Sequence, residues 1–137
     1  MNIHEYQAKQ ILNRYGINIP KGGIAYTPNE AKRVAAQSSF RGPWMLKAQI
    51  QSGARNKGYF LEKKAGNKGG IRQVKSRRDI LKQAEQMLGS TLVTVQTGPE
   101  GKLVSRLYVE AFTKVERVFY AGLAIDRVNA ALTLLVA

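Results

Sequence analysis

The residues best suited to chemistry in this sequence are basic side chains next to a loop of small residues. Lys47 stands near the end of a mostly apolar stretch, residues 43–50, which is typical of a buried strand. The stretch runs into residues 51–58, a flexible, polar segment that carries Arg55. A strand can fix the ammonium group, while loop N–H groups and the guanidinium share the charge of a polyphosphate. The pattern allows a polyphosphate site, and a structural basic loop remains the competing interpretation.

Common nucleotide-binding motifs do not account for these residues. The sequence contains neither the G-x-x-x-x-G-K-[ST] pattern of a P-loop nor the G-x-G-x-x-G pattern of dinucleotide-binding folds. A phosphate site in this chain would therefore combine a strand lysine with the loop that follows it.

Glu110 is the second candidate, because it comes at the end of a predicted strand and is followed by small or apolar residues. A carboxylate in that position can accept hydrogen bonds from an adenine amino group, a ribose hydroxyl or water. An ion pair at the rim of the sheet is the alternative.

Composition limits the kinds of site that the chain can hold. The 137 residues include no cysteine and one histidine, His4, which excludes disulfides, thiolate chemistry and histidine clusters. We expect His4 to be structural or on the surface. The formal net charge of +13 favours polyanionic partners such as nucleotides, coenzyme A, nucleic acid or acidic proteins. Basic residues concentrate in residues 51–78, where Glu62 is the one acid.

The length suits one domain, since domains of roughly 100–150 residues are common. No apolar run approaches the roughly 20 residues that a bilayer requires, and the N-terminus lacks the layout of a secretory signal. We expect no membrane contact and a location in the cytoplasm or the mitochondrial matrix.

Hydrophobic spacing and capping signals predict three helices. The first begins with Asn2 as its cap in a capping box with Glu5, and Gly16 stops it. Thr27 caps the second helix, which ends near residue 38. The third opens at Ser76 and stops at Gly89, which suits a left-handed cap.

Strands are predicted between and after these helices. The segments 92–97 and 103–111 are expected to form one β-hairpin around a Gly-Pro-Glu-Gly turn, and residues 63–70 a mobile loop. The last strand is apolar and nothing follows to cover it, so we expect a fragment or an embedded subunit. The other predicted strands are residues 22–26, 43–50, 71–75, 118–125 and 131–137.

Several segments, in order along nearly the whole chain, carry a family resemblance. They read Met-Asn-Ile-His-Glu-Tyr-Gln-Ala-Lys at 1–9, Trp-Met-Leu-Lys-Ala-Gln-Ile at 44–50, Leu-Val-Thr-Val-Gln-Thr-Gly at 92–98, Tyr-Val-Glu-Ala at 108–111 and Ala-Ile-Asp-Arg at 124–127. The chain thereby resembles the opening of the succinyl-CoA synthetase (succinate–CoA ligase) β subunit, with the malate–CoA ligase β subunit as a close relative.

The resemblance implies an α+β fold, the N-terminal lobe of an ATP-grasp fold, with helices packed on a mixed or antiparallel sheet. Residues 1–20 would form an N-terminal helix and connection, residues 21–112 the nucleotide-binding lobe, and residues 113–137 the first strands of an incomplete second lobe. By the same resemblance Lys47 would hold nucleotide phosphate. Glu110 would face the base or ribose, and Thr113 would add a contact. The implied phosphate loop is Gly53, Ala54, Arg55 and Asn56.

The activity implied is that of an ATP-dependent carboxylate–CoA ligase. In this family ATP phosphorylates a histidine of the partner α subunit, the phosphoryl group passes to succinate, and coenzyme A displaces it. Mg²⁺ accompanies the nucleotide, and its family ligands lie beyond this sequence, so we expect the chain to bind ATP without catalysing alone. Whether succinate or malate is the acid stays open.

Two departures from the family pattern bear on binding. Asn56 stands where the loop usually has glycine, and we expect a strained but tolerated left-handed backbone there. Val118 replaces a nucleotide-contacting carboxylate, and Glu116 is expected on the opposite face of a strand. These departures and the +13 charge also fit an alternative, an inactive ATP-grasp derivative that serves as a basic component of an RNA-rich assembly such as an organellar ribosome.

Overall fold

The computed structural model describes residues 3–37 and 41–137 and shows an antiparallel sheet between two layers of helices. The helices are α1 (Glu5–Arg14), α2 (Pro28–Ala36) and α3 (Arg77–Met87), with short 3₁₀ turns η1 (Arg55–Lys57) and η2 (Lys63–Ala65). The strands are β1 (Gly22–Ala25), β2 (Trp44–Ala48), β3 (Tyr59–Phe60), β4 (Ile71–Val74), β5 (Thr91–Val93), β6 (Lys102–Leu103), β7 (Leu107–Ala111), β8 (Ala121–Asp126) and β9 (Ala131–Val136). This arrangement confirms the predicted α+β class.

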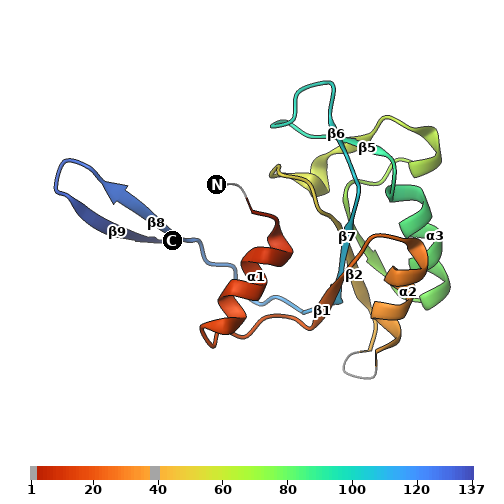
Figure 1. The fold of residues 1–137 in the computed structure, drawn as a ribbon, viewed down its shortest axis with the longest axis horizontal. Helices are drawn as coiled ribbons and strands as arrows, with labels where there is room; N and C mark the ends of the chain where they lie inside the picture. The colour runs from red at the N-terminus through yellow and green to blue at the C-terminus, as the bar shows by residue number, and fades with distance from the viewer. Residues whose placement is uncertain (1–2, 38–40) are drawn as a thin grey trace.

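The main sheet has the strand order β1-β7-β2-β4, and its neighbours all run antiparallel. Figure 1 shows α2 and α3 together on one side of this sheet and α1 on the other. Along β2 the burial pattern alternates, so Leu46 faces the α2 and α3 layer while Lys47 faces the α1 side. The sheet thus separates an apolar face from a face that carries charged side chains.

The core lies between the sheet and the paired helices α2 and α3. Small residues on the helices, such as Ala31, Ala35 and Ala84, are fully buried and let the helices approach the sheet closely. Large side chains fill the space from both layers: Leu46, Leu107, Val109, Ile80 and Met87. Burial of this cluster supplies the main hydrophobic stabilisation.

Most predicted helix ends are confirmed, with one correction. The Thr27 hydroxyl accepts from the backbone N–H of Glu30, and the Ser76 hydroxyl accepts from that of Asp79. Gly89 follows α3 with a φ of 69°, as a left-handed stop requires. The cap of α1 is His4, whose backbone N–H donates to the Gln7 side chain. The predicted cap, Asn2, lies outside the described residues.

The predicted hairpin of residues 92–97 and 103–111 is only partly right. β5 and β6 do pair, through Thr91 with Leu103 and Leu92 with Lys102, in a small sheet with β3. The chain then leaves this sheet, and β7 joins the main sheet between β1 and β2. The first arm ends early because Thr94 and Thr97 bond to each other and form a turn. The alternation of apolar residues could not show that residues 103–111 contribute strands to two different sheets.

The segment predicted as a mobile loop, residues 63–70, is instead held by a buried side chain. The Arg72 guanidinium donates to the carbonyl oxygens of Ala65, Lys68 and Gly69. It also donates to the side chains of Gln83 and Gln86 on α3, and it lies over the Phe60 ring. The composition of residues 63–70 is that of a flexible loop, but one buried arginine close behind them in the sequence fixes their backbone.

The last two strands form a hairpin that pairs with itself and projects from the rest of the chain (Figure 1). One face carries Leu123 and Ile125 with Leu132, Leu134 and Val136 from the partner strand, all exposed. The predicted strand 118–125 begins only at Ala121, so the expectation that Glu116 occupies one face of a strand is wrong. Glu116 and Val118 lie in the exposed connection to the hairpin.

None of the helices in the described part of the chain has the length and apolar character that a membrane span requires.

Candidate functional site

Strand alternation places the first two candidate residues on the same face of the sheet. Lys47 lies opposite Tyr108 of β7, and Glu110 follows two residues later on that strand. Glu110 is buried, and its carboxylate forms ion pairs with Lys47 and with Lys9 of α1. The sequence therefore identified two members of one charged cluster, although it offered a rim position for Glu110 and the structure buries it.

The loop after β2 brings Arg55 to the same cluster. Nη1 of Arg55 donates to the carbonyl oxygen of Ala48 at 2.6 Å, so the guanidinium folds back over the end of β2. Two glycines allow the loop to pack closely. A Cβ on Gly69 would meet the Asn56 carbonyl oxygen at 2.3 Å, and a Cβ on Gly70 would come within 3.3 Å of the Arg55 carbonyl oxygen, which accepts from the Gly70 N–H. The loop is thus fixed by backbone contacts to residues before β4.

The backbone strain in this loop lies at Ala54 and not at Asn56. Ala54 has a φ of 52° and a ψ of 27°, in the left-handed region, and it precedes η1. Asn56 lies inside η1 with a right-handed backbone. The expectation of a left-handed Asn56 is therefore wrong, because the 3₁₀ turn places the reversal two residues earlier.

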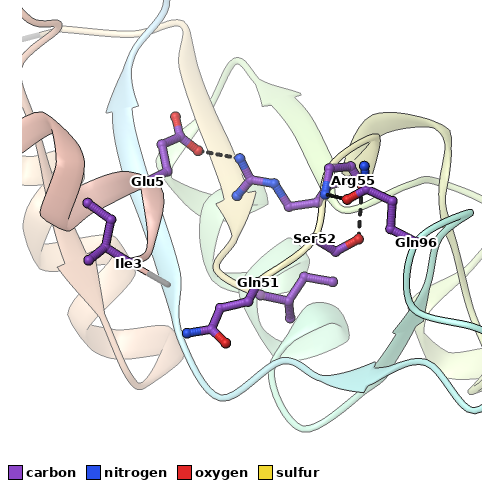
Figure 2. Close-up of a pocket in the computed structure, with 8 residues that line it drawn as sticks. Ile3, Glu5, Gln51, Ser52, Arg55 and Gln96 are labelled. Atoms are coloured by element: carbon purple, nitrogen blue, oxygen red, sulfur yellow. Dashed lines mark hydrogen bonds and ion pairs between the residues drawn. The ribbon is translucent and has the colours of Figure 1, made fainter. Parts of the chain in front are cut away.

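A carboxylate from α1 joins the two candidate cations. Glu5 Oε1 lies 2.9 Å from Lys47 Nζ, and Glu5 Oε2 lies 2.5 Å from Arg55 Nη2. Figure 2 shows the Glu5 carboxylate directed at the Arg55 guanidinium. Lys9, one turn along α1, lies 3.1 Å from Glu5 Oε1 and completes the cluster.

This environment keeps Glu5 ionised. Burial raises its pKa, but hydrogen bonds from Arg55 and Lys47 outweigh burial and lower the pKa to about 2. The cluster combines the carboxylates of Glu5 and Glu110 with the cations of Lys9, Lys47 and Arg55. Two negative and three positive charges leave one net positive charge, which favours an anionic ligand.

Two cavities border this cluster. One, of about 390 Å³, is lined by Lys47, Glu110 and Thr113 together with apolar side chains such as Met45 and Ile71. The other, of about 410 Å³, is lined by Gly53, Arg55 and Glu5, with Gln96 on the far side (Figure 2). Five candidates thus line the cavities, whereas Ala54 and Asn56 do not and instead shape the loop backbone.

The second cavity contains side chains that sequence reasoning did not single out. Gln96 Oε1 accepts from the Gly53 N–H at 2.6 Å, and a Cβ on Gly53 would come within 3.0 Å of that amide. Ser52 also lines this cavity, and its hydroxyl lies 2.5 Å from that of Thr94. The turn that cuts short the predicted strand 92–97 therefore positions Gln96 against the phosphate-loop candidates.

Chemically, the cluster can hold a polyanion beside a mixed apolar and polar cavity. Lysine and arginine donors suit phosphate oxygens, and buried Glu110 suits an amino or hydroxyl donor. Within residues 3–37 and 41–137, no three His, Cys, Asp or Glu side chains lie close enough to hold a metal ion together.

The sequence also matches a known protein family. A family model described as an ATP-grasp domain matches residues 2–137. The chain belongs to the ATP-grasp family.

Among curated proteins, the chain is similar to β subunits of succinate–CoA ligases. The chain is 50% identical over 136 residues to the β subunit of the ADP-forming succinate–CoA ligase of Rhodospirillum rubrum, covering 98% of this chain and 34% of the relative. It is 46% identical over 137 residues to the corresponding subunit of Rhodopseudomonas palustris, covering 99% of this chain and 34% of that relative. The same subunit of Paracoccus denitrificans is 50% identical over 128 residues. The chain therefore spans about a third of the length of the curated relatives it matches.

These relatives give no support to the RNA-associated alternative, because those matched are named as ligase subunits.

Sequence reasoning missed two residues of the cluster, Glu5 and Lys9. Both fall in the N-terminal nonapeptide that carried the resemblance, and their i, i+4 spacing predicts only a pair on the helix surface. Their contacts with Lys47, Arg55 and Glu110 depend on how α1 packs on the sheet.

Proposed function

We propose that this chain is the nucleotide-binding part of the β subunit of an ATP-dependent carboxylate–CoA ligase. The observation that carries the proposal is the convergence of Lys47 and Arg55, from a strand and its following loop, on one charged cluster beside a cavity lined by Glu110. The relatives, named as ADP-forming succinate–CoA ligase subunits, support ATP as the nucleotide and succinate as the acid.

In this proposal, different residues would hold the phosphates and the base or ribose of ATP. Lys47 and Arg55 would hold phosphate oxygens. The Gly53 N–H could also donate to a phosphate oxygen, after its hydrogen bond to the Gln96 side chain breaks. The base or ribose would enter the cavity beside Glu110 and Thr113, whose apolar walls suit a ring system. Ala54 and Asn56 would act by shaping the loop. Mg²⁺ would enter as the counter-ion of ATP, as the family resemblance implies.

The remaining parts of the proposal rest on the relatives. We expect an α subunit as partner, because the relatives are named as β subunits. The family resemblance implies transfer to succinate through a phosphohistidine of that subunit. We expect residues 113–137 to begin the second lobe, since the β8–β9 hairpin exposes an apolar face. The relatives are bacterial, which favours a cytoplasmic location over the mitochondrial matrix.

Calorimetric titration with ATP tests the proposal. We expect the wild-type chain to bind ATP, and Lys47→Ala to weaken binding roughly 10- to 100-fold through loss of a charged hydrogen bond. Lys82→Ala, at an exposed position of α3, is the matched control and should bind like the wild type. An absence of ATP binding by the folded wild type, or equal binding by Lys47→Ala, would refute the proposal.

A further inference from the structure

The charged cluster contains a carboxylate, Glu5, to which the ligase resemblance assigns no role. It comes from α1, outside the sheet and loop that carry Lys47 and Arg55, yet its two oxygens contact both cations. We propose that Glu5 is a positioning residue, which holds the Lys47 ammonium and the Arg55 guanidinium in one geometry so that a triphosphate meets an assembled pair. This inference rests on the proposed nucleotide site.

The geometry favours positioning because each cation keeps donors for a ligand. A lysine ammonium has three N–H groups, and the ion pairs of Lys47 with Glu5 and Glu110 engage two. Arginine has five N–H groups, and Arg55 directs two of them at Glu5 and at the Ala48 carbonyl. Within the described part of the chain, donors of both side chains therefore remain after Glu5 has been satisfied.

The charge balance of the cluster is compatible with this positioning role. As an anion, Glu5 lowers the positive charge that attracts phosphate, but it does not cancel it. By formal charge, two carboxylates and three cations leave the cluster one net positive charge, so the field still favours an anion. Without Glu5, Lys47 and Arg55 would repel each other, and each would regain the rotamer freedom of a long side chain.

The way α1 packs on the sheet explains how a residue of this helix can position Lys47 and Arg55. None of the described residues of α1 is buried. The helix instead meets the sheet through polar contacts: Glu5 with Lys47 and Arg55, Lys9 with Glu110, and the Tyr6 N–H with the Gln49 side chain at 3.2 Å. The Glu5 contacts therefore both help to dock α1 and arrange the two candidate phosphate-binding cations.

The test compares ATP with adenosine on the full 137-residue chain. Glu5→Gln keeps the size of the side chain but removes its charge, and we expect roughly tenfold weaker ATP binding, equivalent to fixing one long side chain. Adenosine lacks phosphates, so its affinity should stay at the wild-type value. Glu85→Gln makes the same change of charge at an exposed position of α3 and should leave both affinities unchanged.

The affinities of the Glu5 variants decide whether Glu5 positions the two cations. Unchanged or tighter ATP binding by Glu5→Gln overturns it, and tighter binding identifies Glu5 as a competitor of the phosphates. Equal losses for ATP and adenosine also overturn it, because they show general damage to the fold. Should Glu5→Gln not fold, Glu5→Asp keeps the charge but withdraws the carboxylate by one methylene, and the same selective loss is expected. A wild-type chain that binds no ATP refutes the proposed function together with this inference.

Discussion

We expect the ion pairs of Glu5 to make the folded chain less stable as the pH falls. Its pKa is lowered to about 2 in the folded chain, from an ordinary value of 4.5, so the folded state favours the ionised form. The stabilisation is fully present above about pH 4.5 and is lost as pH falls toward 2, because the proton must then be accepted by the paired carboxylate.

Urea unfolding at pH 5 and pH 3 checks this expectation. The wild type should lose roughly 1–3 kcal/mol more of its free energy of unfolding over that interval than Glu5→Gln, which has no proton to bind at this position. Equal losses in the two proteins would show that Glu5 does not contribute to the acid sensitivity.

Ala54 carries the strained backbone of the phosphate-loop candidate. At a φ of 52°, glycine is at least as favourable as alanine, so we expect Ala54→Gly to be nearly neutral. Ala54→Val places a β-branched side chain in the left-handed region and should cost about 1–3 kcal/mol. Thermal unfolding measures both, with Ala36→Val at the exposed end of α2 as control. A destabilisation by Ala54→Gly as large as that by Ala54→Val would contradict the assigned conformation.

At the scale of elements, Arg72 of β4 fixes the loop that supports η1. Arg72→Met leaves the carbonyl oxygens of Ala65, Lys68 and Gly69 without their donor, at a cost of about 2–4 kcal/mol. Because the Gly70 N–H holds the Arg55 carbonyl, we also expect weaker ATP binding. Urea unfolding and calorimetry test the two effects, with the exposed Arg78→Met as control. A variant as stable as the control would mean that the loop does not depend on Arg72.

The elements show which signals the sequence carries. Thr27, Ser76 and Gly89 act on backbone groups a few residues away, so their roles could be predicted locally. Arg72 bonds partners on both sides along the chain, and charge alone could not distinguish it from its exposed neighbours. The strand face of Lys47 follows from alternation, whereas the contact between Glu5 and Arg55 joins positions 50 residues apart and requires the tertiary fold.

At the scale of the whole molecule, the β8–β9 hairpin leaves an apolar face in solvent. Leu123 and Leu134 lie directly opposite each other on that face, 73% and 65% exposed. Contiguous exposed apolar surface promotes association, so we expect concentration-dependent self-association that replacing both leucines by threonine reduces. Sedimentation velocity measures the effect, with Ala124→Ser on the other face as control. Association unaffected by the double substitution would show that another surface is responsible.

In the proposed complex, the ATP phosphates contact Lys47 and Arg55 beside the cavity that Glu110 lines. A crystal structure of the chain with a non-hydrolysable ATP analogue tests this directly. We predict phosphate oxygens within hydrogen-bonding distance, about 3 Å, of Lys47 Nζ and the Arg55 guanidinium, with the base or ribose beside Glu110 and Thr113. Phosphates bound at another surface, with Lys47 and Arg55 still paired only to Glu5, would contradict it.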